Sequence, residues 1–107
     1  MKYEIVKLDN SDTCTESIPA LISKLEKAKK KSSTLLLDMK NVTLINSGGI
    51  GVLIRTHKDL QVAGGGIVIA NPAETALAML ENSGLSGIVK TYDTLADAKK
   101  ALDNKQA

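Results

Sequence analysis

Two short, uninterrupted apolar runs most strongly limit how this chain can fold. Leu35-Leu36-Leu37 lies within the segment from Ser33 to Asp38, and the segment from Ile67 to Ala70 reads IVIA. Neither run alternates with polar residues. Such runs are typical of strands in a parallel sheet, where both faces of the sheet are covered. The chain should therefore carry helices that cover these strands.

Helical periodicity surrounds the two runs. From about Ser17 to Lys30, apolar residues recur three and four positions apart, and Pro19 falls in the first turn, where its missing N–H costs least. The buried stripe of this helix should be Ile18, Leu21, Ile22, Leu25 and Ala28. A second helix is predicted from about Gly48 to Ala63, and Gly64-Gly65-Gly66 should end it. Its inner face should hold Ile50, Leu53, Ile54, His57 and either Leu60 or Gln61.

The remaining segments continue the same alternation. Tyr3 to Leu8 and Ile88 to Tyr92 are predicted strands. A third helix should begin at Asn71-Pro72-Ala73-Glu74, with Asn71 as the N-cap and Pro72 at the first helical position, and should end at Ser83-Gly84. Its buried stripe should be Ala73, Ala76, Leu77 and Leu80.

A fourth helix, Thr94 to Asn104, should open with a capping box formed by Thr94 and Asp97. Strands and helices thus alternate four times along the chain. This order predicts one α/β domain over residues 1–107, with an open and largely parallel sheet of four or five strands flanked by about four helices.

Composition excludes several classes of function. The 107 residues include two Tyr but no Phe or Trp, so the core should be aliphatic, and aromatic platforms for single-stranded nucleic acid are absent. A net charge of +2 is too small for general attraction to nucleic acid or membranes. Cys14 is the only cysteine, and no run approaches the roughly 18 apolar residues of a membrane span. We expect a cytoplasmic protein that binds neither nucleic acid nor membrane directly.

The segment INSGGIG, residues 45–51, lies where a strand should run into a helix, which is where functional groups gather in such sheets. Ser47 could be a nucleophile, but Ile45 replaces the first glycine of the G-x-S-x-G elbow. The only histidine, His57, lies ten residues further along the same helix, about 15 Å away in rise. No base is therefore available to activate Ser47.

Two non-catalytic interpretations of this segment remain. The glycines leave backbone N–H groups open at a helix N-terminus, which favours an anion, but no lysine follows them as in a P-loop. Alternatively, Ser47 caps the helix and the glycines permit a tight turn. Spacing alone favours the cap. A capping hydroxyl also lies near the surface, where another protein can reach it.

Other candidate residues fit structural roles better than catalytic ones. His57 falls on the apolar side of its helix and has no partner at metal-ligand spacing. Asp38 ends a strand, as the phosphoacceptor of receiver domains does, but lacks the acidic neighbours that hold Mg²⁺. The lysines at positions 24–31 suit a helix C-terminus. We therefore expect no catalytic residue, no metal site and no cofactor.

The stretch LLLDMKNVTLINSGGIG, residues 35–51, resembles the signature of STAS domains, and in particular of bacterial anti-sigma factor antagonists. That signature is a hydrophobic strand ending in Asp, a V-T segment, and D-S-S-G-L-G-V entering a helix. The likeness continues through the glycines before IVIAN and through the S-G-L at Ser83 to Leu85. It covers most of the chain beyond residue 33 and is weaker before it.

The resemblance implies a function without catalysis. In that family, an anti-sigma factor that is also a serine kinase, a GHKL-type ATPase, phosphorylates the first serine of the motif, which here is Ser47. The unphosphorylated antagonist binds the kinase, phosphorylation breaks the complex, and a PP2C-type phosphatase restores it. A phosphate adds about −1.5 to −2 charge, which disrupts an interface built around a neutral hydroxyl.

This chain departs from the family pattern at three places. Asn46 replaces the commoner Asp, Gly48 replaces the second serine, and we expect one strand of the family's N-terminal hairpin to be missing. The resemblance places Asp12 near an acidic loop residue that contacts the kinase. The implied partner-binding residues are Asp12, Asn46, Ser47, Gly48, Gly49 and Ile50. The alternatives are a STAS scaffold or transport-complex subunit in which Ser47 is not modified, and a small nucleotide-responsive module.

Overall fold

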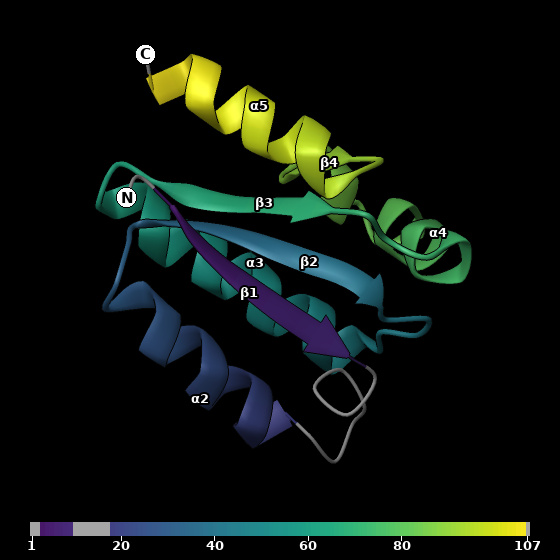
Figure 1. The fold of residues 1–107 in the computed structure, drawn as a ribbon. Helices are drawn as coiled ribbons and strands as arrows, with labels where there is room; N and C mark the ends of the chain where they lie inside the picture. The colour runs from purple at the N-terminus through teal and green to yellow at the C-terminus, as the bar shows by residue number, and fades with distance from the viewer. Residues whose placement is uncertain (1–2, 10–17, 107) are drawn as a thin grey trace.

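The structure is a computed structural model that describes residues 3–9 and 18–106 (Figure 1). Four parallel strands form one sheet within these residues, in the order β1-β2-β3-β4. Their bounds are β1 Glu4–Asp9, β2 Thr34–Asn41, β3 Gly66–Ala70 and β4 Lys90–Tyr92. The α/β class and the predicted parallel sheet are therefore confirmed, with the smaller of the two predicted strand numbers.

Helices cover both faces of the sheet. The connecting helices are α2 (Ile18–Lys29), α3 (Ser47–Val62) and α4 (Glu74–Asn82), and α5 (Leu95–Gln106) follows the last strand. Because the strands pair in chain order and crossovers between parallel strands are right-handed, the connecting helices fall on one face. The last helix, α5, crosses the other face over β3 and β4 (Figure 1).

The two layers bury different residues of the same strands. Leu35, Leu37 and Met39 of β2 point into the large core beneath α2, α3 and α4, whereas Leu36 belongs to the smaller cluster beneath α5. All four side chains have a relative exposure of 0%. The uninterrupted apolar run therefore reflects coverage on both faces, as the sequence predicted.

The third helix begins later than the sequence predicted. Asn71 adopts a φ of 60° and its N–H donates to the carbonyl of Tyr92 at 2.9 Å, so it continues the pairing with β4 and is not the N-cap. Asn tolerates this left-handed conformation better than most residues. The N-cap position falls on Ala73, which makes no side-chain capping bond, and α4 starts at Glu74.

The last strand is shorter than predicted for a similar local reason. Residues Leu85–Gly87 form a 3₁₀ turn, η2, and the carbonyl of Leu85 accepts hydrogen bonds from the N–H groups of Ile88 and Val89. Those two residues are therefore unavailable for sheet pairing, and β4 starts at Lys90. One half of the capping box predicted for the final helix is present, because the Asp97 N–H donates to Thr94 Oγ1 at 3.0 Å.

The three glycines at residues 64–66 join α3 to β3 in a turn that only small residues fit. Gly64 has a φ of 87°, and the N–H groups of Gly64 and Gly65 bond to the last carbonyls of the helix. A Cβ at Gly65 would lie 1.8 Å from the carbonyl oxygen of Ser33, which accepts the N–H of Gly66. The end of α3 and the start of the sheet are thus locked together here.

Replacing Gly65 by alanine should therefore destabilise the domain. We expect Gly65→Ala to lower the free energy of unfolding by about 1–3 kcal/mol, because the added methyl must displace the Ser33 backbone. Urea unfolding measures this change. Gly87→Ala is the matched control, since its added Cβ would meet nothing within 4 Å. Equal losses in the two variants would contradict the packing described for Gly65.

Candidate functional site

The loop between β2 and α3 brings Ser47 to the carboxyl end of the sheet. Val42 and Ile45 are fully buried and anchor the loop from below, whereas Thr43 and Leu44 are exposed. The hydroxyl of Thr75, in the first turn of α4, donates to the carbonyl of Thr43 and ties the loop to the neighbouring helix. The site is thus held by the core and by a second element, and it remains open to solvent.

Asn46, not Ser47, is the N-cap of α3. The Asn46 backbone is extended, and its Oδ1 accepts a hydrogen bond from the N–H of Gly49 at 2.8 Å. The prediction that Ser47 caps the helix is therefore wrong, although the helix begins where the motif indicated. Asn and Ser are both good N-cap residues, so residue type alone does not decide which of the two takes the position. The amide of Asn46 takes it and leaves Ser47 as the first helical residue.

This arrangement leaves the hydroxyl of Ser47 unused by the fold. Ser47 is exposed and makes no side-chain hydrogen bond with any residue that the structure describes. The N–H groups of Ser47 and Gly48 belong to the first turn, where an α-helix has no carbonyl to offer them. An accessible hydroxyl therefore lies beside open donors at the positive end of a 16-residue helix.

The three glycines of the motif differ in the space that surrounds them. A Cβ at Gly49 would approach the Cγ1 atom of Ile45 to 3.0 Å, so the buried loop residue leaves no room for a side chain. A Cβ at Gly48 would lie 3.3 Å from the Cδ1 atom of Ile18, at the start of α2. Gly51 differs from both, because a Cβ there would meet nothing within 4 Å.

The structure divides the predicted partner-binding residues into two groups. Ser47 and Gly48 are exposed and Asn46 is half-buried, so these three can touch a partner. Gly49 and Ile50 are buried beneath them, with Ile50 9% exposed. These two form the packed base of the motif, and their contact with a partner stays a prediction. Asp12 lies outside the described residues, and its role stays a prediction.

Sequence reasoning missed two exposed apolar side chains near Ser47. Leu44 is 62% exposed, immediately before the buried Ile45. Ile22, which the helical periodicity placed in the buried stripe of α2, is 43% exposed. Periodicity could not place Ile22 correctly, because it gives the direction of a side chain but not how far the neighbouring helix extends over it. For Leu44, the one sequence signal of an exposed apolar side chain was its position in a loop.

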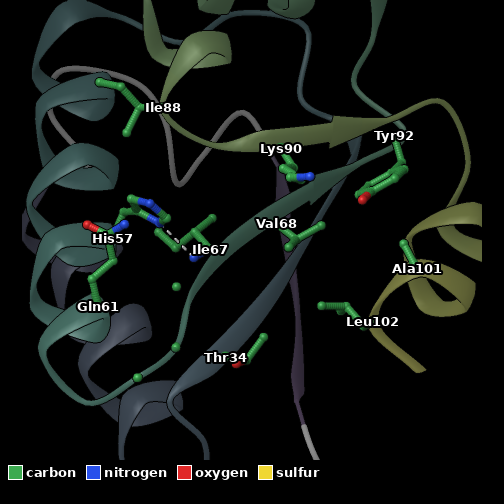
Figure 2. A pocket seen from close by; sticks show the side chains of 13 residues that line it. Thr34, His57, Gln61, Ile67, Val68, Ile88, Lys90, Tyr92, Ala101 and Leu102 are labelled. Atoms are coloured by element: carbon green, nitrogen blue, oxygen red, sulfur yellow. Dashed lines mark hydrogen bonds between the residues drawn. The ribbon is translucent and has the colours of Figure 1, made fainter. Parts of the chain in front are cut away.

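His57 has a structural role at the other end of α3. Its Nδ1 atom accepts a hydrogen bond from the backbone N–H of Ile67 at 2.9 Å, so the ring is neutral with its proton on Nε2. Only Val68 to Ala70 of β3 pair with the short strand β4. His57 therefore accepts the N–H of Ile67, which β4 does not reach (Figure 2). Burial lowers the pKa of His57 below its usual value.

The residues around His57 do not form a catalytic arrangement with Ser47. His57, Gln61, Lys90 and Tyr92 are among those lining a cavity of about 460 Å³ at the edge of β3, and Ser47 is not among them (Figure 2). Asp38 accepts a hydrogen bond from the N–H of Lys40. Residues 3–9 and 18–106 contain no group of three acidic, His or Cys side chains arranged to hold a metal.

Comparison with known proteins decides the family. The family model of the STAS domain matches residues 5–98. The chain belongs to the STAS domain family. A helix long and apolar enough to cross a membrane is absent from the part of this STAS domain that the structure describes.

Relatives with known names support the same assignment. The anti-sigma-B factor antagonist of Bacillus subtilis is 29% identical over 73 residues, which is 68% of this chain and 67% of that protein. The anti-sigma factor antagonist SpoIIAA in its unphosphorylated form has the same fold, with a TM-score of 0.78 and 16% identity over 96% of this chain and 90% of that chain.

The same fold occurs in a protein of another description. A sulfate transporter family protein from Wolinella succinogenes matches with a TM-score of 0.78 and 13% identity, over 94% of this chain and 84% of that chain. At these identities the two structures establish the STAS fold alone, and the site must be argued from its own residues.

The N-cap assignment predicts different stabilities for two neighbouring variants. Asn46→Ala should lower the free energy of unfolding by about 0.5–2 kcal/mol, because it removes the acceptor of the Gly49 N–H. Ser47→Ala should change it by less than about 0.5 kcal/mol, since its hydroxyl bonds to nothing described. Chemical denaturation of both variants measures the difference. A larger loss for Ser47→Ala would contradict the assignment.

The hydrogen bond of His57 predicts a dependence of stability on pH. Because the folded pKa lies below the usual 6.5, the unfolded chain binds the proton first as the pH falls. The contribution of His57 is therefore fully present above about pH 6.5 and is lost as the pH falls through the folded pKa. Thermal unfolding between pH 7.5 and 5 measures it, and this is the only histidine in the chain.

His57→Asn is the matched control for this pH dependence. The Oδ1 atom of Asn can accept the same N–H of Ile67 without titrating in this range. We expect the variant to lose the change in stability near pH 6 that the wild type shows. An unchanged pH profile in His57→Asn would show that other groups cause the dependence.

Proposed function

We propose that this STAS domain is an anti-sigma factor antagonist that acts as a phosphorylatable partner switch. Its partner would be an anti-sigma factor that is also a serine kinase, a GHKL-type ATPase. The observation that carries the proposal is the exposed hydroxyl of Ser47 at the start of α3, which bonds to no described residue, in a chain with antagonist relatives. Ser47 would be the substrate of the kinase, and the domain itself would catalyse nothing.

The electrostatics of the site favour a switch that leaves the fold intact. A phosphate on Ser47 would lie at the positive end of α3, near the open N–H groups of the first turn. Asn46 is neutral and already holds the helix cap through Gly49, so phosphorylation need not break the cap. The added charge of about −1.5 to −2 would act outward, on a surface that a partner must desolvate.

The cycle would therefore be controlled at the interface. The unphosphorylated domain would bind the kinase and so release the sigma factor. The phosphorylated domain would dissociate, because two negative charges would be buried against a surface that fits a hydroxyl. A PP2C-type phosphatase would reset the switch by removing the phosphate from the exposed Ser47. These events would take place in the cytoplasm.

The alternative proposal is a STAS scaffold or a subunit of a transport complex that is not modified. The fold shared with a sulfate transporter family protein is compatible with it. Because that likeness is at 13% identity, it carries no argument about the site. The unused hydroxyl of Ser47 favours the switch.

Phosphorylation tests the proposal directly. Wild-type protein, incubated with ATP and each GHKL-type serine kinase encoded in the same genome, should take up one phosphate, measured by intact-mass spectrometry. Ser47→Ala should take up none, whereas Ser23→Ala, which removes another exposed serine, should be labelled like the wild type. Phosphorylated protein should bind the kinase about tenfold or more weakly. Labelling of Ser47→Ala, or no labelling of the wild type by any of these kinases, would refute the proposal.

A further inference from the structure

A groove runs between α2 and α3 directly beside the proposed phosphorylation site. It has a volume of about 460 Å³ and begins at Gly48, the residue after Ser47. Ile18 and Ile22 of α2 form one apolar side, and Gly51 and Val52 of α3 lie opposite. The two helices lie next to each other on the same face of the sheet (Figure 1). Because Gly48 lines the groove, a protein whose active site reaches the hydroxyl of Ser47 comes close to it.

Gly51 is the residue of the groove that the fold does not explain. It lies inside α3, it is exposed, and a Cβ there would meet nothing within 4 Å. Its φ is not in the left-handed region that favours glycine. A glycine inside a helix lowers stability relative to alanine without any compensating contact here. Its effect is to leave the backbone of α3 bare at the floor of the groove, so that an incoming side chain can approach it closely.

The charged side chains that line the groove differ in whether they form an ion pair. At its far end, Glu26 and Asp59 share the Nζ atom of Lys29, at 2.9 and 3.4 Å, so one cation is engaged by both carboxylates. Arg55 also lines the groove and makes no ion pair with any residue that the structure describes. An occupant that meets this groove should therefore bring a carboxylate for Arg55 as well as an apolar side chain.

We propose that this groove receives an amphipathic segment of the anti-sigma factor kinase, with an apolar side chain over Gly51 and a carboxylate on Arg55. The inference rests on the proposed function and deepens it, because it names a second contact of the same partner beside Ser47. The apolar side chain lies between Ile18, Ile22 and Val52. This contact anchors the kinase while Ser47 is presented to its active site, and its strength does not depend on the Ser47 hydroxyl.

Three pairs of variants test this contact, each with a control outside the groove. Gly51→Leu fills the groove and is compared with Val62→Leu, since Val62 is an exposed residue at the end of the same helix. Ile22→Ala, 43% exposed, is compared with Ile88→Ala, 47% exposed. Arg55→Glu is compared with Lys58→Glu, which makes the same charge change on an exposed position of α3.

Binding is measured by titration calorimetry with the purified kinase that phosphorylates the wild type, in the absence of ATP. We expect the dissociation constant to rise about tenfold or more for Gly51→Leu and Arg55→Glu, and severalfold for Ile22→Ala, with the controls within about twofold of the wild type. Thermal unfolding checks that each variant folds, and Gly51→Leu should unfold at a higher temperature than the wild type because leucine is the better helix former.

The outcomes separate this inference from the proposed function. If the wild type binds the kinase and the groove variants bind as tightly as their controls, the groove inference is wrong and the switch at Ser47 stands. If no kinase binds the wild type, both are wrong. If the wild type elutes as a dimer in size-exclusion chromatography and Gly51→Leu elutes as a monomer, a second copy of this chain occupies the groove, which also overturns the inference.

Discussion

Burial of strand β2 on both faces is the constraint on which the rest of the structure depends. Leu35, Leu36 and Leu37 are completely inaccessible to solvent, and each such side chain contributes about 1.5–3 kcal/mol relative to an exposed position. Because neighbouring residues of a strand point to opposite faces, this run requires a layer of helices on each side. One layer comes from the connecting helices and the other from α5. The direction of β2 then fixes where the chain leaves the sheet, and so where Ser47 lies.

Two adjacent polar residues of the site, Asn46 and Ser47, have different roles. Asn46 satisfies an N–H of the first helical turn, and Ile45 and Gly49 pack beneath it. The hydroxyl of Ser47 therefore bonds to no residue that the structure describes, and it remains at the surface. This separation suits a modifiable position, because Asn46 keeps the capping hydrogen bond to the N–H of Gly49 whether or not Ser47 carries a charge. An exposed serine next to a neutral cap can change its charge while the fold stays as it is.

The same geometry argues against a catalytic role for the motif within this domain. The one histidine is committed to the backbone of Ile67, which needs an acceptor because β4 is short. It lies away from Ser47 along α3, and no carboxylate of residues 3–9 or 18–106 bonds to its ring. The features that gather around Ser47 are instead those of a contact surface: the exposed Leu44, open N–H groups, and the groove floored by Gly51. They favour a partner that brings the catalytic groups with it.

The sequence by itself determined the alternation of strands and helices, the parallel sheet, the core of β2 and β3, and the position of INSGGIG at a strand-to-helix junction. These features depend on periodicity and on turn residues, which are local. It failed where two nearby residues were candidates for the N-cap position of a helix: Asn46 against Ser47, and Asn71 against Ala73. At Asn71 the tertiary structure decided, because its N–H pairs with the carbonyl of Tyr92 on a neighbouring strand, whereas the bond between Asn46 and Gly49 is local. The tertiary structure alone also showed that Ile22 is exposed beside α3 and that Gly51 faces open space, since both facts depend on how closely two helices approach each other.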